Sequence, residues 1–99
     1  MASLIVLYWR DIPSQVIAKR DRALAKRVLP HRFTVAIDAA AMHAGATSTD
    51  AYLEDWRRGE PSPCGDDLEA EASAAAARLE AEYDDRRLAR LAEQVGREV

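Results

Sequence analysis

The sequence predicts an α+β protein, in which a small N-terminal antiparallel β-sheet of two or three strands is followed by three helices, the last one long. Three observations predict this class. The first twenty residues are rich in β-branched and aromatic side chains, which favour strands. Apolar residues recur at helical spacing after Pro30. From Asp66 onward, alanine alternates with charged residues that favour a long helix. A chain of 99 residues forms one domain, 1–99.

Residues 3–10 predict the first strand. Its two faces carry Leu4, Val6 and Tyr8 on one side, and Ile5, Leu7 and Trp9 on the other. Because both faces are apolar, we expect a strand that is central or covered on both sides. Residues 11–14 read as a turn in which Pro13 presets φ. Residues 15–19 then predict a second strand, which completes a hairpin.

Residues 20–29 leave two alternatives open. Asp21 either lies in a tight turn before a third strand, or caps a short helix. The residue before a proline avoids the α region, so Leu29 before Pro30 favours the strand. In either case residues 1–29 form a β-rich, basic part of the domain.

Residues 30–59 predict two short helices. The first covers about 31–44, with Pro30 at its start and Gly45 in the position that commonly ends a helix. The pair Thr47 and Asp50 resembles a capping box and predicts the start of the second helix. That helix carries apolar residues on one face and ends at Gly59; these residues are Tyr52, Leu53 and Trp56.

Residues 60–65 predict a rigid loop, and residues 66–96 one long acidic helix that Asp66 caps. The apolar stripe of this helix consists of Leu68, Ala72, Ala75, Leu79 and Tyr83, and it resumes one residue late with Leu88, Leu91 and Val95. This slip falls at Asp84 and Asp85, where we expect the helix to bend or to change the surface on which it packs.

The charge is distributed unevenly along the chain. Residues 1–32 contain seven basic and two acidic residues, a net charge of +5. Residues 33–99 contain seven basic and fifteen acidic residues, a net charge of −8. The single cysteine, Cys64, excludes an internal disulfide and fits a reducing compartment. We see no signal peptide and no apolar run that could span a membrane, so we expect a cytoplasmic protein.

The residue pattern argues against catalysis. Cys64, His31 and His43 lie too far apart in sequence to form the close ligand pairs of a zinc site. Cys64 precedes the predicted long helix, whose dipole would lower its pKa, but four nearby acids would raise it. We find no glycine-rich phosphate loop and no nucleophile–base pair, so we expect no catalytic residue, no metal and no cofactor.

A run of basic residues offers one candidate site. Its members are Lys19, Arg20, Arg22, Lys26 and Arg27, followed by Arg32. Such a patch can hold an anionic ligand or an acidic protein, or it can be solvated or paired within the fold. The sequence pI of about 5.3 argues against nucleic acid.

Two clusters of tryptophan and arginine offer a second candidate site, because these residues are common interface anchors. They are Trp9 with Arg10, and Trp56 with Arg57. The alternative is that both tryptophans belong to the core of a domain that has few large apolar side chains.

Three strings of the sequence resemble the small bacterial proteins of the "virulence factor" domain family. They are Tyr8 to Val16 (YWRDIPSQV), Asp50 to Gly59 (DAYLEDWRRG) and Cys64 to Leu68 (CGDDL). The resemblance implies an accessory subunit of one-carbon metabolism, beside tetrahydrofolate- and corrinoid-linked methyl transfer. It carries over no catalytic residue.

Two hypotheses of function follow. In the first, the protein is a non-catalytic accessory subunit that binds a larger partner, such as a methyl-transfer enzyme, through Trp9, Arg10, Trp56 and Arg57. The C-terminal helix would then add a second surface or a homodimer seam. In the second, the basic run binds a small anionic ligand within a concave pocket.

Overall fold

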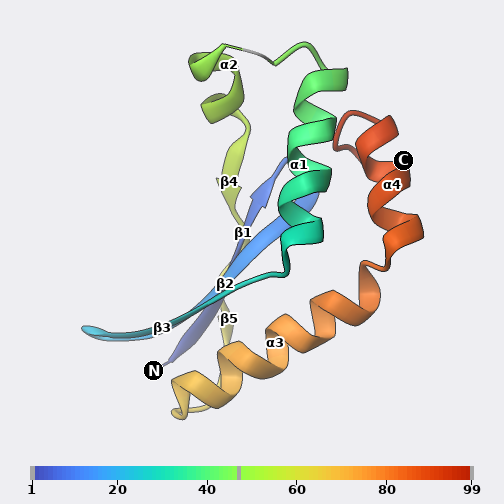
Figure 1. The fold of residues 1–99 in the computed structure, drawn as a ribbon. Coiled ribbons are helices and arrows are strands. Elements are labelled where there is room, and N and C mark those ends of the chain that lie inside the picture. The colour runs from blue at the N-terminus through green and yellow to red at the C-terminus, as the bar shows by residue number, and fades with distance from the viewer. Residues whose placement is uncertain (1, 47, 99) are drawn as a thin grey trace.

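A computed structural model of the chain describes residues 2–46 and 48–98. Five strands and four helices follow one another along this part of the chain (Figure 1). In order they are β1 (Ser3–Trp9), β2 (Ile12–Arg20), β3 (Ala23–Val28), α1 (His31–His43), α2 (Thr49–Glu54), β4 (Trp56–Arg58), β5 (Ser62–Pro63), α3 (Leu68–Glu82) and α4 (Asp85–Glu93). The α+β class is therefore confirmed, with more strands and one more helix than predicted.

The sheet is antiparallel with the strand order β3-β2-β1-β4, and β5 also pairs with β1. The first hairpin turn is tighter than predicted, and the second is the tight turn that one of the two alternatives placed at Asp21. Arg10 and Asp21 adopt positive φ values of 54° and 52°, which lets each hairpin turn within two residues. Pro13 therefore lies inside β2 and not in a turn. The register shifts beside it, and proline is tolerated in a strand at such an irregularity. The third strand is confirmed.

The core lies between the sheet and the helices. Its largest fully buried side chains are Trp9, Phe33, Ile12, Leu91 and Val16. Helix α1 follows the predicted range closely and lies alongside α4, as Figure 1 shows. A second, smaller cluster joins Ala18, Ala25 and Ala72, where short side chains let α3 pack closely against β2 and β3.

The prediction of a helix through Arg58 is wrong, because α2 ends at Glu54 and Trp56–Arg58 forms β4. This short strand pairs with β1, placing Trp56 opposite Trp9 and Arg57 opposite Tyr8. Ser48 caps α2, since its side chain accepts a hydrogen bond from the Ala51 amide at 3.2 Å. The expected capping box depends on Thr47, which lies outside the described residues.

The prediction of one long helix over 66–96 is also wrong. It is two helices, α3 and α4, separated at Tyr83 and Asp84. The cap of α3 is Asp67, whose side chain accepts from the Ala70 amide, and not the predicted Asp66. The Asp84 side chain accepts a hydrogen bond from the Arg87 amide at 2.8 Å and so caps α4. The Arg32 guanidinium donates to the carbonyls of Tyr83 and Glu80, which satisfies backbone groups at the end of α3. The slip in the apolar stripe thus marks a full break.

Candidate functional site

Trp9 lies in the core, at the end of β1. Its side chain has no exposed surface, and its indole Nε1 donates to the Tyr52 carbonyl at 2.8 Å. The Trp9 ring stacks on the Tyr52 ring, which in turn meets the edge of Trp56, each pair with centroids 5.9 Å apart. Trp56 is half-buried at the margin of this cluster. Trp9 is therefore a core residue, as the second alternative had it, and its side chain is not available to contact a partner.

Arg10 joins three separate segments of the chain. Its guanidinium pairs with the Asp55 carboxylate at 3.1 Å and donates to the Val95 carbonyl at 2.7 Å. Arg57 donates to the Arg10 carbonyl at 2.9 Å and to the Asp11 carboxylate at 3.3 Å. The structure thus brings Trp9, Arg10, Trp56 and Arg57 together. The two guanidinium groups bind other parts of the chain, although the buried Nε of Arg10 has no hydrogen-bond partner among the described residues. We call this set the β1–β4 junction.

One face of the sheet mixes apolar with polar side chains and lies away from the two core clusters. Residues paired directly across antiparallel strands share a face. The registers place Leu7 beside Gln15 and Val28, Ile5 beside Ile17 and Lys26, and Ser3 beside Lys19 and Leu24. The apolar members of this open sheet face are Ile5, Leu7, Ile17, Leu24 and Val28, and none of them packs in either core cluster.

Two of these side chains are strongly exposed, Leu24 at 59 % and Val28 at 67 %. Leu7 and Ile17 are half-buried, and Ile5 is buried among its neighbours on the strands. Helix α3 covers the other face, where Ala18 and Ala25 contact Ala72. The strand is therefore apolar on both faces, as the sequence indicated, but within the described residues only one face is covered.

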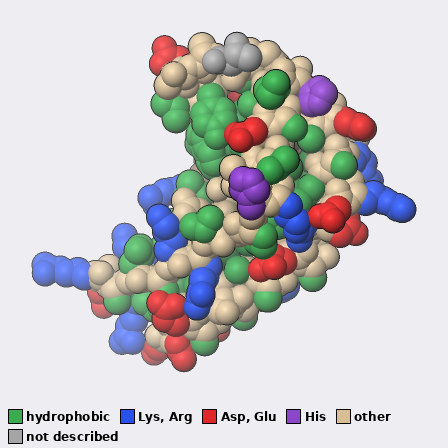
Figure 2. All heavy atoms as spheres, viewed as in Figure 1, with side chains coloured by type: hydrophobic (Ala, Val, Ile, Leu, Met, Phe, Trp, Pro, Cys, Tyr) green, Lys and Arg blue, Asp and Glu red, His purple; other side chains and the backbone are tan. Residues whose placement is uncertain are grey.

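The basic run lies on the hairpin of β2 and β3, over which lysine and arginine side chains gather (Figure 2). Arg20 pairs with Asp66 at 3.5 Å and Arg27 with Glu69 at 3.4 Å, both toward the start of α3. Lys19 and Lys26 lie on the open sheet face, and so does Arg58, which is paired with Leu7. None of these three side chains forms an ion pair with another described residue. The run is thus divided between the two faces.

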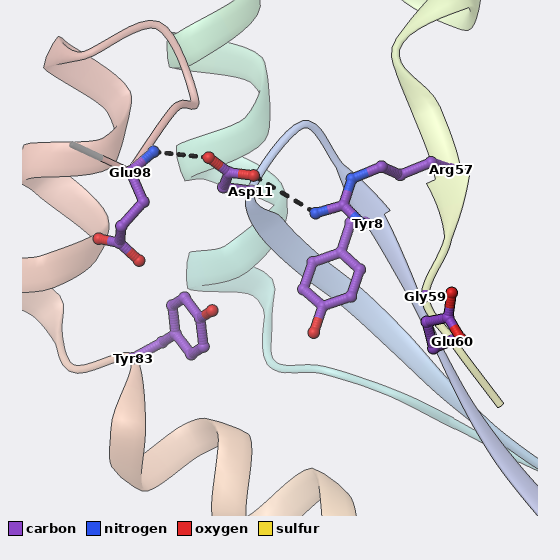
Figure 3. A pocket seen from close by; sticks show the side chains of 7 residues that line it. All are labelled: Tyr8, Asp11, Arg57, Gly59, Glu60, Tyr83 and Glu98. Carbon is purple, nitrogen blue, oxygen red and sulfur yellow. Dashed lines mark hydrogen bonds and ion pairs between the residues drawn. The ribbon is translucent and has the colours of Figure 1, made fainter. Parts of the chain in front are cut away.

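No pattern in the sequence predicts the polar cavity that lies on the helix side of β1. Tyr8, Asp11, Arg57, Gly59, Glu60, Tyr83 and Glu98 line an open cavity of about 360 Å³ (Figure 3). A second cavity of about 160 Å³ shares Tyr8, Gly59 and Glu60 with the first. Its other lining residues are Leu4, Val6, Ser62, Ala75, Arg78 and Leu79. We call the first cavity the polar cleft. None of the residues in the basic run lines either cavity.

The polar cleft contains two phenol rings that are each backed by an arginine. Arg57 lies over the Tyr8 ring at 4.5 Å, and Arg87 over the Tyr83 ring at 3.9 Å. The Asp11 carboxylate accepts from Arg57 and from the Glu98 amide, the latter at 2.6 Å. Arg87 pairs with the Glu98 carboxylate at 2.6 Å. Burial, above all, raises the pKa of Tyr83, so its hydroxyl stays protonated at neutral pH.

The other groups considered for chemistry lie apart. Burial, then the carboxylates of Glu71 and Asp66, raises the pKa of Cys64, so the thiol is no activated nucleophile. His31 and His43 lie at opposite ends of α1. Over residues 2–46 and 48–98, no three histidine, cysteine or carboxylate side chains gather as metal ligands would. No helix within these ranges has both the length and the apolar composition needed to cross a bilayer.

These features define a small α+β protein with a partly exposed sheet face, a polar cleft, and an apolar hollow between α1 and α4. The chain belongs to the family described as "Virulence factor", whose model matches residues 7–92. No curated protein matches the chain, and neither does any solved structure. The matched range contains the strings around Tyr8 and Trp56 on which the resemblance was based.

Proposed function

We propose that this protein is a non-catalytic accessory protein that binds a larger protein partner through its open sheet face. The observation that carries the proposal is the exposure of Leu24 and Val28 on a sheet face whose apolar side chains pack in neither core cluster. Exposed apolar patches of this kind mark interaction surfaces in soluble proteins. A sheet face that carries β-branched and leucine side chains can pack against a second protein layer.

The charges on this face define the partner's chemistry. Lys19, Lys26 and Arg58 share the face with the apolar residues, and no acidic residue lies among the paired positions of the three rows. A second copy of the chain, packed face to face, would bring like charges together. An apolar partner surface with an acidic rim would complement them. Helix α4 is a weaker candidate for a dimer seam, because it buries Leu88 and Leu91 within the fold.

The resemblance adds a pathway to the proposal. We propose that the partner is a cytoplasmic methyl-transfer enzyme of one-carbon metabolism, linked to tetrahydrofolate or a corrinoid. Family membership is what supports this second step, since the geometry of the open sheet face specifies only an apolar and acidic surface. A small anionic ligand on the basic run has less support, because Arg20 and Arg27 are paired and the hairpin forms no part of the cavities above.

The test compares capture of a partner by matched variants. The tagged protein and two double variants are incubated with extract of the source organism at moderate salt, and co-eluting proteins are identified by mass spectrometry. Leu24→Ser with Val28→Ser removes the most exposed apolar surface of the open sheet face. Met42→Ser with Leu53→Ser removes two side chains of similar exposure, 74 % and 57 %, from α1 and α2. All four positions are exposed, so both variants should fold.

We expect a stoichiometric partner with the parent protein and the Met42/Leu53 variant, and loss of that partner with the Leu24/Val28 variant. A folate or corrinoid methyl-transfer enzyme would support the pathway as well. Equal capture by both variants would place the interface elsewhere, and a partner-free elution of the parent protein would refute the accessory function.

A further inference from the structure

We infer that the partner adds a strand to the outer edge of β3. The segment that fits there is an extended peptide with one acidic side chain between two apolar ones. The inference rests on the proposed function, because it takes the partner from there and adds how that partner is held. It extends the binding surface from the side chains of the open sheet face to the backbone of the strand that borders it.

Every second residue of β3 directs its backbone outward. The strand lies at the end of the sheet and, within the described chain, pairs only with β2. The Leu29 amide donates to the Ser14 carbonyl at 3.0 Å, which makes these two residues a hydrogen-bonded pair in the register of β2 and β3. Such pairs alternate along an antiparallel ladder, so the residues of each intervening pair direct their N–H and C=O away from the neighbouring strand. On β3 the outward residues are Leu24, Lys26 and Val28, and their backbone groups have no backbone hydrogen-bond partner among the described residues.

The two edges of the sheet differ in how open they are to a further strand. The far edge consists of β4 and β5, which have three and two residues, and its sequence contains Pro61 and Pro63. Short strands and prolines protect an edge from pairing. By contrast, β3 has six residues, no proline and an unbroken register with β2. Most of its residues are exposed, and Figure 1 shows the tip of the hairpin projecting away from the helices.

The charge on this edge selects the incoming segment. Lys26 is exposed, lies between Leu24 and Val28 on the open sheet face, and forms no ion pair with another described residue. A second copy paired over all three outward residues would place Lys26 opposite its own equivalent, and like charges directly opposite destabilise a ladder. A carboxylate opposite Lys26 would stabilise the pairing, and apolar side chains two positions away on either side would contact Leu24 and Val28. The segment that fits is therefore extended, acidic at its centre and apolar on both flanks.

The test is an NMR titration of the isotope-labelled full chain with the peptide acetyl-Thr-Val-Thr-Glu-Thr-Val-Thr-amide. Paired antiparallel to β3, this peptide places its glutamate opposite Lys26 and its valines opposite Leu24 and Val28. We expect saturable shifts, and slower exchange with solvent, for the amides of these three residues. The amides of Ala25 and Arg27 already face β2 and should change little. Equal changes along the whole hairpin, or changes that map elsewhere, would overturn the inference.

Matched peptides separate strand addition from charge attraction. Methylation of the glutamate amide nitrogen removes a donor that faces β3, and should weaken binding about tenfold through loss of one hydrogen bond. Methylation of the threonine nitrogen that follows removes a donor that faces solvent, so this peptide should bind within about threefold of the parent peptide. Replacement of the glutamate by lysine should weaken binding about three- to tenfold, because an opposite-charge pair becomes a like-charge pair. Equal losses with the two methylated peptides would show that no strand is added.

Two variants of Lys26 examine the same edge from the protein side. Lys26→Pro removes an outward amide and leaves the bonds to β2 in place, and an edge strand tolerates proline at such a position. Lys26→Gln removes the charge and keeps the amide. We expect no saturable binding by the proline variant, and binding weakened about two- to fivefold by the glutamine variant. Parent-like binding by a proline variant whose amide signals remain dispersed would refute the added strand; should that variant not fold, the methylated peptides decide the question.

The peptide titration and the capture experiment fail independently, because the titration needs no extract. Peptide binding combined with a partner-free elution would refute the accessory function and leave the edge site standing. Capture of a partner through Leu24 and Val28 without peptide binding would overturn the added strand, and would leave packing on the open sheet face as the mode of contact.

Discussion

Two glycines provide a measurement of how rigidly the β1–β4 junction is packed. Gly96 and Gly45 both adopt positive φ, 82° and 73°. A Cβ at Gly96 would lie 3.0 Å from Cζ3 and 3.3 Å from Cε3 of the Trp9 ring, whereas a Cβ at Gly45 would meet nothing within 4 Å. Both Gly→Ala substitutions carry the left-handed penalty of about 1–2 kcal/mol. Gly96→Ala adds overpacking of about 1–3 kcal/mol, because Trp9 is fully buried and hydrogen-bonded in place.

We therefore expect Gly45→Ala to lower the free energy of unfolding by about 1–2 kcal/mol and Gly96→Ala by about 2–5 kcal/mol. Urea unfolding followed by circular dichroism measures both. In thermal melts, each kcal/mol corresponds to about 4–8 °C for a domain of this size. Equal losses for the two variants would refute the reasoning, because they would show that the Trp9 ring moves aside at no cost.

Three further predictions concern residues that the sequence singled out. Trp9→Ala should cost about 3–5 kcal/mol of stability, measured by urea unfolding, while the fraction that remains folded should capture a partner normally; reduced capture by folded protein would instead make Trp9 a contact residue. Arg10→Met should cost about 1–3 kcal/mol, because the partly buried Asp55 carboxylate loses its 3.1 Å partner; an unchanged unfolding midpoint would show that the pair is neutral. Since the pKa of Cys64 is raised, less thiolate is present at pH 8 than in a free cysteine, so iodoacetamide should alkylate it more slowly than a cysteine in an unstructured peptide; a faster reaction would contradict this direction.

Local patterns were sufficient to predict the N-terminal hairpin, the third strand and α1. Each of these elements depends on a pattern of a few residues. The patterns are the alternating β-branched residues, the backbone preference of Leu29 before Pro30, and Gly45 after an apolar helical stripe. The same local patterns failed at Trp56–Arg58. This strand forms because it pairs with Tyr8 and Trp9, nearly fifty positions away, and helix propensity carries no information on that pairing.

The break between α3 and α4 was visible in the sequence only as a phase slip. Alanine-rich composition favoured a continuous helix, and Asp84 followed by Asp85 could as well lie on a solvated face. The deciding interactions are tertiary. The Tyr83 ring packs against Phe33 of α1 with centroids 6.2 Å apart, and Arg32 binds the carbonyls that the broken helix leaves free. A separate N-cap at Asp84 then starts α4 in a new direction.

The candidate sites could be predicted only in part. The sequence analysis correctly predicted that β1 is apolar on both faces. One of these faces contributes Ile5 and Leu7 to the open sheet face. Which face remains uncovered depends on where α3 packs, and this the sequence did not reveal. The polar cleft was missed because its residues share no motif. They come from β1 and β4, from the residues that follow each of these strands, from the break between α3 and α4, and from the segment after α4. Tyr83 was taken for a stripe residue of a long helix.

The strings that identify the family also limit what family membership says about function. Tyr8 supports Arg57, Trp9 fills the core, Arg10 holds Asp55 and the Val95 carbonyl, and Asp11 holds Arg57 and the Glu98 amide. Each of these side chains makes a contact within the chain, so their presence is explained by the need to build the β1–β4 junction. Family membership therefore bears on the fold of that junction, and we expect a partner to be recognised by other residues. Leu24 and Val28, which lie outside all three strings, are the positions at which binding and folding can be separated by experiment.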